Sequence, residues 1–190
     1  MAYSLQAQVS AGPRGPRGAL SLAARIRARK GVAIRLTDDF DESFDHLWAR
    51  LPKSGLILSD RASATLTWRY HDHPTRRFKV ARFMRDAELR GYVVFEIAQP
   101  ESEWSIQDIV VAEPRDLACM LALLILHSLD GGGVSAIRLS LSDDHPYSRR
   151  LWRLGFVPRA PQGAFQVLEA TPPGTRFKGS WCLTQGDKDI

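Results

Sequence analysis

The chain has 190 residues, which is enough for one domain with a well-buried core. With 44% hydrophobic and 25% charged residues, its composition is that of a globular protein and excludes fibrous and disordered classes. The net charge of +5 is unevenly placed, because residues 1–30 hold six basic residues and no acidic one, which leaves 20 basic and 21 acidic residues in 31–190. Since the charge of residues 31–190 is balanced, we expect no nucleic-acid partner.

The number of cysteines and the length of the apolar runs indicate in which cellular compartment the protein is expected. Two cysteines, Cys119 and Cys182, cannot form a disulfide framework, and their spacing fits no metal site. The apolar run from Leu117 to Leu126 is about half as long as a bilayer span, so it predicts a buried helix. Residues 1–30 lack the apolar segment of a secretory signal. We therefore expect a cytoplasmic protein with no metal and no membrane contact, in which residues 1–30 form a flexible basic arm or the remnant of a linker.

Hydrophobic periodicity predicts a strand and two helices at the start of the folded part. Residues 32–36 alternate and predict a strand. In "TDDFDESFDHLWARL" the apolar residues recur at helical spacing behind a capping residue, Asp39 or Asp41. A second helix is expected in "SDRASATLTWRYHDHP", with Ser59 as its N-terminal cap and Pro74 at its end.

The rest of the chain alternates between strands and helices. In chain order, the expected elements are strands at 78–83 and 89–97 joined by a hairpin turn at 85–88, a strand at 104–111, a helix at 115–129, a strand at 134–141, a short helix in "DDHPYSRRLWRLGF", and strands at 165–170 and 180–184. Asp144 is expected to cap the short helix and Gly155 to end it. The order β-α-α-β-β-β-α-β-α-β-β predicts a mixed α/β sheet with helices on both faces, in a single domain over 31–190.

This order, together with several stretches, resembles the GNAT superfamily of N-acetyltransferases. "ELRGYVVFEI" is similar to the family's third strand, "VVAEPRDLACMLALL" to its strand–loop–helix, and "DHPYSRRLWRLGF" to its fourth helix with a closing Gly-Phe pair. "WRYHDHP" and "WCLTQGDKD" resemble a bacterial group in which such a domain is the C-terminal half of a two-domain protein. The resemblance covers about residues 32–184. It implies a GNAT-like acyl-CoA N-acyltransferase fold, with a V-shaped opening between the strand ending near Val111 and the strand at 134–141.

The resemblance also implies acetyl-CoA or another acyl-CoA as co-substrate, with its pyrophosphate on the N–H groups at a helix start. The implied cofactor-binding residues are Val110, Val111, Arg115, Leu117, Ala118 and Met120. The family signature Arg/Gln-x-x-Gly-x-Gly/Ala begins at Arg115, so Ala118 and Met120 stand where the glycines are expected. Asp116 opposes a phosphate, and Met120 either blocks its approach or turns into the core. CoA binding is thus left open.

Two residues are candidates for the transfer chemistry, in which an amine attacks the thioester and an acid and a base assist. The family's usual acid is a tyrosine at the position of Leu151, so Tyr147, one helical turn earlier, is the candidate acid. Asp108 is the candidate base, expected on the same face of its strand as Ile106 and Val110. The alternative for Asp108 is a hydrogen-bonded structural acid.

Candidate substrate contacts are Arg69, Tyr70 and His145, of which Arg69 suits a carboxylate or phosphate. Two functions follow. The first is a GNAT-type acyltransferase that moves an acetyl or other acyl group to a small-molecule or peptide amine. The second is a catalytically inactive GNAT-like binding or scaffolding module, which Met120 and Leu151 favour. The expected partners are a second GNAT-like domain or a second copy of the chain.

Overall fold

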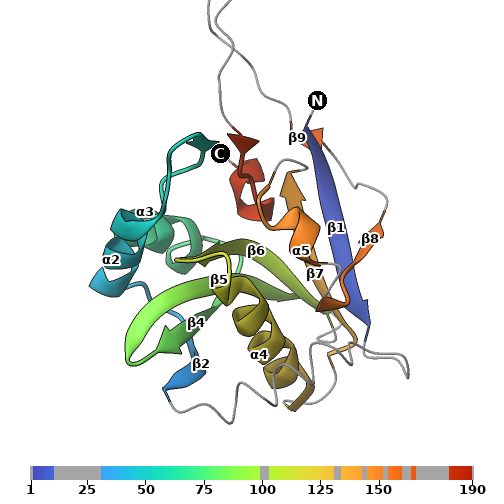
Figure 1. Ribbon diagram of the computed structural model, residues 1–190, viewed down its shortest axis with the longest axis horizontal. Helices are drawn as coiled ribbons and strands as arrows, with labels where there is room; N and C mark the ends of the chain where they lie inside the picture. Colours follow the sequence, from blue (N-terminus) through green and yellow to red (C-terminus); the bar gives the residue numbers. More distant parts are fainter. Residues whose placement is uncertain are drawn as a thin grey trace, which may run out of the picture.

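The computed structural model describes residues 2–10, 31–98, 103–130, 134–142, 145–151, 154–159, 164–165 and 180–189. They form a mixed eight-stranded sheet in the order β2-β4-β5-β6-β7-β1-β8, with β9 paired to β1, and a separate two-stranded pair, β3 and β10 (Figure 1). The strands are β1 (Ala2–Ser10), β2 (Val32–Thr37), β3 (Leu56–Ile57), β4 (Lys79–Arg85), β5 (Glu88–Ala98), β6 (Glu103–Val111), β7 (Ala136–Ser142), β8 (Val157–Arg159), β9 (Ala164–Phe165) and β10 (Ser180–Trp181). The helices are α2 (Glu42–Arg50), α3 (Ser63–Leu66), the π-helical turn η1 (Thr67–His71), α4 (Asp116–Asp130), α5 (Ser148–Leu151) and the 3-10 helix η3 (Gln185–Asp189).

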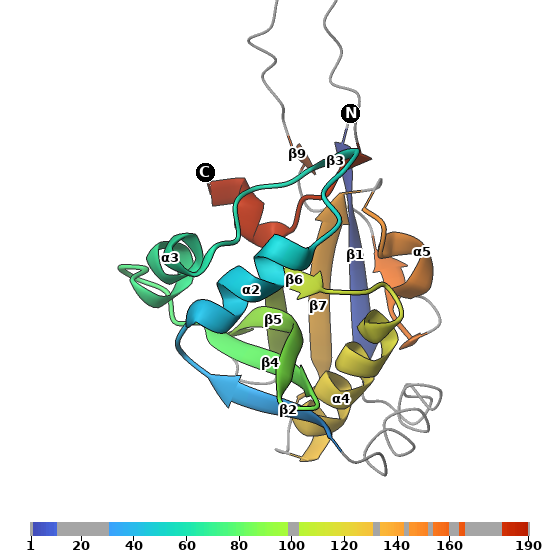
Figure 2. The same ribbon diagram turned by 60° about the vertical axis from the view of Figure 1, so that its left-hand side comes forward.

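Two apolar cores lie on the two faces of the sheet. On one face α4 packs through Leu117, Leu121 and Leu124, and on the other α2 packs through Phe44 and Leu47 (Figure 2). Neighbouring residues of the central strands point to opposite cores, because side chains of a strand alternate between its faces. The mixed α/β sheet with helices on both faces is therefore as the sequence predicts. No helix among the described residues is long and apolar enough to span a membrane.

The local signals at α2 and at the β4–β5 hairpin are confirmed. Asp41 caps α2, since its carboxylate accepts a hydrogen bond from the Ser43 N–H at 3.0 Å. Asp86 and Ala87 connect β4 to β5 with φ angles of 51° and 65°, the left-handed pair that a tight hairpin requires. By contrast, Ser59 is not the cap of the second helix. That helix begins at Ser63, and its N-cap residue is Ala62, which has no capping side chain. Asp45 of α2 accepts the hydrogen bond of the Ser63 N–H instead, at 2.8 Å.

A bulge in β6 decides where Asp108 points. Val94 of β5 pairs with Asp108, whereas the next residue of β5, Phe95, pairs with Ile106, so Gln107 is an extra residue in β6. The expectation that Asp108 shares a face with Ile106 is wrong for this reason. Ile106 lies in the core beneath α4, and Asp108 lies on the side of α2 and α3 with Val110.

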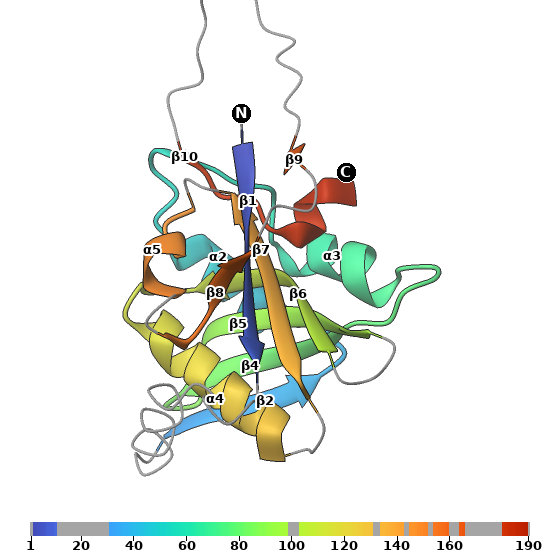
Figure 3. The same cartoon turned by 90° about the vertical axis from the view of Figure 1, so that its right-hand side faces the viewer.

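The opening between β6 and β7 is present, and the C-terminal segment lies in it. The two strands pair in parallel only from Glu103 to Ile106 and from Ala136 to Leu139. Beyond this point Leu141 of β7 forms an antiparallel bridge with Thr184, and η3 follows directly (Figure 3). The split is predicted from the family resemblance. Beside Leu141 it is occupied by the protein's own residues, from Thr184 into η3.

The edge of the sheet beside β7 differs from expectation. Residues 1–30 were expected to lie outside the fold, but β1 pairs antiparallel with β7 over seven residues, from Ser4↔Ser142 to Ser10↔Ala136. The expectation is thus wrong for Ala2–Ser10, while residues 11–30 lie outside the described part. The strand expected at 180–184 is shorter and pairs with β3 instead of the main sheet. Of the strand expected at 165–170, only Phe165 is described, paired with Ala2.

Candidate functional site

A buried ion pair joins the α3 side of the sheet to the bulge of β6. Arg61 is 3% exposed and Asp108 is 0% exposed. The Arg61 Nε lies 3.1 and 3.0 Å from the two carboxylate oxygens of Asp108, and its Nη2 lies 3.0 Å from Oδ1. The Tyr92 hydroxyl donates to the same carboxylate at 2.9 Å and the Thr184 hydroxyl at 3.2 Å. Asp108 therefore has a full set of donors.

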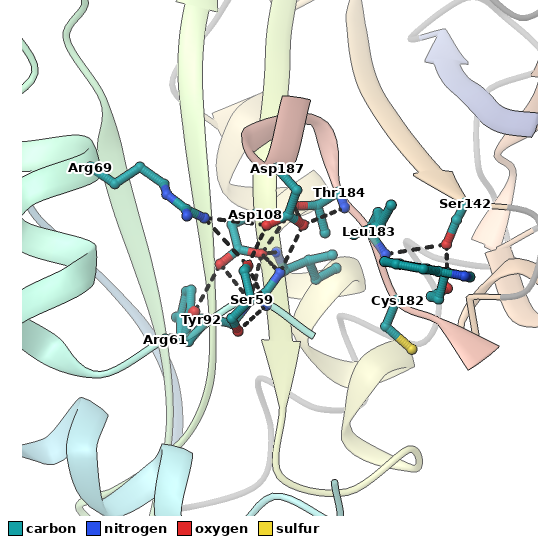
Figure 4. A network of polar contacts seen from close by, with 12 residues as sticks. Ser59, Arg61, Arg69, Tyr92, Asp108, Ser142, Cys182, Leu183, Thr184 and Asp187 are labelled. Atoms are coloured by element: carbon teal, nitrogen blue, oxygen red, sulfur yellow. Dashed lines mark hydrogen bonds and ion pairs between the residues drawn. The ribbon is translucent and has the colours of Figure 1, made fainter. Parts of the chain in front are cut away.

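Asp187 of η3 extends this pair into a network of four charges (Figure 4). Its carboxylate lies 3.1 Å from Nη2 of Arg61 and 3.2 Å from Nη1 of Arg69. The Ser59 hydroxyl and the Thr184 N–H also donate to it. Burial alone would raise the pKa of Asp187, but Arg61 and these hydrogen bonds hold it below its usual value. The network thus fixes the C-terminal segment in the split of the sheet.

The contacts of Asp108 fit a structural role better than that of a general base. A general base must reach the proton of a substrate, either directly or through one water. The carboxylate of Asp108 is fully buried, and its oxygens are taken by Arg61, Tyr92 and Thr184. Of the two readings that the sequence allows, the hydrogen-bonded structural acid fits these contacts.

An apolar cavity of about 160 Å³ lies beside the open end of β6, and we call it the Tyr147 pocket. Its walls come from β6, from the start of α5 and from the segment after α2. They include Leu51, Leu58, Val110, Val111, His145 and Tyr147. Four residues singled out from the sequence, namely Val110, Val111, His145 and Tyr147, therefore meet at one cavity.

Tyr147 is the polar group of this pocket best placed to meet a ligand. Its hydroxyl oxygen accepts a hydrogen bond from the Val111 N–H at 3.2 Å, and among the described residues it donates none. Burial, with a further contribution from the carboxylate of Asp108, raises the pKa of Tyr147 to about 12. The hydroxyl is therefore protonated at neutral pH. Leu151, at the family's usual tyrosine position, is 1% exposed and belongs to the core.

His145 contributes a neutral imidazole to the same pocket. Burial, followed by the nearby Arg61 cation, lowers its pKa to about 3. Its Nδ1 accepts a hydrogen bond from the Tyr147 N–H at 3.2 Å, so the neutral ring carries its proton on Nε2. Its ring lies 4.6 Å from that of Tyr147. His145 thus orients the start of α5 and is a weak base.

The start of α4 carries acids where the family resemblance implies a pyrophosphate. Asp116 is fully buried, and its carboxylate lies 2.8 Å from Arg85 and 3.7 Å from Arg90. Glu113 pairs with Arg90 and with Arg115, whose side chain is 73% exposed. The cations near this helix start are therefore paired with the protein's own carboxylates.

The other residues implied for the cofactor lie mostly in the core beneath α4. Leu117 and Met120 are both 0% exposed, and Ala118 is half-buried against the same cluster. Met120 thus turns into the core and does not block the helix start.

Arg69 and Tyr70 line a different cavity, of about 240 Å³, which we call the Trp68 pocket. Trp68, Phe78, Gln107 and Gly186 also line it, and it shares no lining residue with the Tyr147 pocket. The ionic network of Arg61, Asp108 and Asp187 links the two regions. The residues predicted to contact substrate are therefore divided between two cavities.

Sequence reasoning missed Arg61, Thr184 and Asp187. Arg61 stands in a run that predicts a helix, and nothing in the sequence pairs it with residues 47 and 126 positions away. Of the residues in this network, only Asp108 had a signal in the sequence, because it is an acidic residue within a strand rich in β-branched side chains.

Comparison with known proteins shows the fold alone. No family model and no curated protein matches the sequence. The crystal structure of a conserved protein of unknown function from Staphylococcus epidermidis matches with a TM-score of 0.59 at 10% identity, over 83% of this chain and 58% of that one. The C-terminal domain of a candidate lysylphosphatidylglycerol synthetase from Agrobacterium fabrum matches with a TM-score of 0.43 at 11% identity, over 73% of this chain and 47% of that one. At 10% and 11% identity, the similarity to these structures concerns the fold alone. The chain spans about half the length of these structures.

Proposed function

We propose that the chain is a GNAT-type acyltransferase domain that holds the acyl thioester of its donor in the Tyr147 pocket and transfers the acyl group to an amine. One observation carries the proposal: Tyr147, whose hydroxyl oxygen accepts a hydrogen bond from the Val111 N–H, lines an apolar cavity beside the end of β6. The cavity suits an acyl group, because its walls are mostly aliphatic and proline side chains. The GNAT-like order of elements supports the same reading.

The reaction follows from the groups at hand. The nitrogen of a neutral amine attacks the thioester carbonyl carbon, a C–N bond forms, and the C–S bond breaks. The proton lost by the amine ends on the departing thiolate, so that an amide and a thiol result. The Tyr147 hydroxyl, with a pKa raised to about 12, stays protonated and stabilises the developing thiolate by a hydrogen bond. His145 is too weak a base to deprotonate an ammonium, so the acceptor must arrive uncharged.

The acidic residues at the start of α4 affect how the CoA part of the acyl donor could bind. Asp116 and Glu113 engage Arg85, Arg90 and Arg115, so these cations are already paired where a pyrophosphate would bind. We therefore propose that the acyl-pantetheine arm of an acyl-CoA provides most of the binding free energy. On this proposal, acetyl-CoA and S-acetylpantetheine bind with affinities within about threefold of each other.

The experiment is a transfer assay with each of the two thioesters and a panel of primary amines, read as released thiol. Tyr147→Phe should keep the fold and lower kcat by about 10- to 100-fold, because it removes one hydrogen bond to developing charge. Tyr70→Phe, which alters the Trp68 pocket only, is the matched control. Thiol release that is unchanged in Tyr147→Phe would overturn the assigned role.

The second candidate function is a catalytically inactive module that binds an acyl group or thioester without transfer. It is favoured by the structural position of Asp108, which leaves the pocket without a carboxylate base among the described residues. Calorimetry separates the two functions. Binding of S-acetylpantetheine with no thiol release supports the module, and the absence of binding contradicts both candidates.

A further inference from the structure

The Tyr147 pocket is larger than an acetyl group requires. Its volume of about 160 Å³ is close to that of an apolar cavity of about 150 Å³ that binds benzene, a molecule of six carbon atoms. An acetyl group has a single carbon beyond its carbonyl and would leave most of this volume empty. Because an empty apolar cavity forgoes the dispersion contacts that a filled one makes, the size points to a longer acyl group.

The walls of the pocket fall into two groups. Val110, Val111 and Tyr147 lie at the end of β6 and the start of α5, where the acyltransferase proposal places the thioester. The second group comes from α2 and the segment after it, and consists of Trp48, Leu51, Pro52, Leu56 and Leu58. An acyl chain whose carbonyl lies beside Tyr147 can therefore extend along a second set of apolar side chains.

The second group of walls is accessible to a ligand. Trp48, Leu56 and Leu58 are half-buried, so part of each side chain is uncovered. Among the described residues, neither of the two apolar cores includes these three side chains. Large apolar side chains that lie uncovered around one cavity are typical of a binding site.

The lining offers a charged acyl group no free partner. Arg61 is the charged side chain among the described lining residues, and it is 3% exposed and paired with Asp108 and Asp187. Burial lowers the pKa of His145 to about 3, so its imidazole is neutral at pH 7. A carboxylate or ammonium on the acyl chain would lose its water without gaining a counter-ion from these residues.

We propose that the acyl group of the donor is an uncharged chain of about four to eight carbon atoms, and that the side chain of Leu58 limits its length. The inference rests on the acyltransferase proposal, because it takes the thioester to lie beside Tyr147, and it names the class of donor. Side chains of an extended segment alternate, so Leu56 and Leu58 line the cavity and Ile57 between them does not.

The test is calorimetry on the full chain, without an amine, with S-acetyl-, S-butanoyl-, S-hexanoyl- and S-dodecanoylpantetheine. Affinity should rise about fourfold with each methylene up to about hexanoyl, which is the factor that burial of one CH₂ provides, and should not rise further once the cavity is full. S-Succinylpantetheine has four acyl carbons like the butanoyl thioester but ends in a carboxylate, and should bind at least about 10-fold more weakly than it. Equal affinity for the acetyl and hexanoyl thioesters would overturn the proposal.

Thiol release with a panel of primary amines separates this inference from the acyltransferase proposal. Release that is independent of chain length would overturn the inference and leave transfer in place. A preference for hexanoyl in calorimetry, with no release from any thioester, would support the chain length and overturn transfer. The absence of binding by every thioester would overturn both.

Two substitutions of Leu58 test its role. Leu58→Trp places a larger side chain in the cavity and should weaken binding of the hexanoyl thioester about 10-fold, while the acetyl thioester changes by less than about threefold. Leu58→Ala enlarges the cavity and should move the preferred chain from hexanoyl towards octanoyl. Ile57→Trp is the matched control at a position outside the lining and should keep the affinities of the natural chain. Equal weakening of both thioesters by Leu58→Trp would overturn the assignment of Leu58.

Discussion

Arg61 and Asp108 show what burial does to a pair of charges. Each side chain is at most 3% exposed, and together they hold Tyr92, Thr184 and Asp187 in place. A buried pair adds little net stability, but removal of one partner leaves an uncompensated charge in a medium that solvates it poorly. The pair therefore fixes the geometry around the bulge of β6.

Arg61→Met should lower the free energy of unfolding by about 3–5 kcal/mol, because Asp108 would stay buried without a cation. The exposed pair of Lys79 and Asp38 provides the matched control. Lys79→Met should change stability by less than about 1 kcal/mol. Urea unfolding measures both. A small effect of Arg61→Met would show that Asp108 finds water or another cation.

Met120 shows that a residue at a predicted ligand site can belong to the core. Met120→Gly should cost about 1 kcal/mol of helix propensity and about 2–5 kcal/mol for the vacated volume, because the side chain is 0% exposed. The affinity for CoA should not change. Ala118→Gly, in the same helical turn but half-buried, should cost mainly the propensity. Denaturant unfolding and calorimetry with CoA check both variants, and stronger CoA binding by Met120→Gly would contradict the core assignment.

At the scale of elements, β1 and the segment from Thr184 to η3 both contact β7, and they come from opposite ends of the sequence. β7 pairs with β6 over only four residues and with β1 over seven. The open part of the split is occupied by the segment from Thr184 to η3, which the network of Arg61 and Asp187 fixes. Both ends of the chain are thus part of the fold.

Deletion of residues 1–10 should lower the melting temperature by about 14–28 °C. β7 would lose seven strand partners, each hydrogen bond contributes about 1 kcal/mol, and a loss of 1 kcal/mol shifts the melting temperature by about 2–4 °C at this size. Ala7→Pro, which removes one N–H from the centre of β1, should give a smaller shift. Thermal unfolding followed by circular dichroism measures both. An unchanged melting temperature would mean that β1 leaves the sheet at little cost.

For the whole molecule, the buried His145 predicts how stability depends on pH. Its folded-state pKa of about 3 lies below the ordinary value of 6.5, so the unfolded chain binds more protons between these values. The free energy of unfolding should therefore fall by about 1.4 kcal/mol for each pH unit below about 6, and this contribution is fully present only above the unfolded pKa. Carboxylates with lowered pKa, such as Asp187, add their own loss below about pH 4.

His145→Phe should reduce the slope of stability between pH 6 and 5 by most of this amount. Urea unfolding at several pH values measures the slope, and His46→Phe is the control, because His46 lies on the exposed face of α2. The same slope in the natural chain and in His145→Phe would show that His145 is accessible to protons in the folded state.

Local signals in the sequence determined most of the elements. The cap at Asp41, the hairpin before β5 and the apolar run of α4 each depend on residues within a few positions of one another, so periodicity and turn chemistry suffice to predict them. The order of these elements also determined the mixed sheet with a core on each face. Four residues of the Tyr147 pocket had been singled out as candidates, mostly through the family resemblance, and they lie in two short stretches, 110–111 and 145–147.

Tertiary structure decided the rest, since contacts between distant residues have no local signature. The bulge at Gln107 depends on how β5 and β6 align, and a shift of one residue moved Asp108 to the opposite face. Arg61 reaches Asp108 from the segment before α3, and Asp187 joins this pair because the C-terminal segment lies in the split. The sequence alone determined most of the strands and helices from Val32 onward, but not β1. Only the tertiary structure decided that β1 pairs with β7. The backbone N–H and C=O groups at the edge of β7 can pair with any extended segment, so this pairing depends little on side-chain identity or on distance along the sequence.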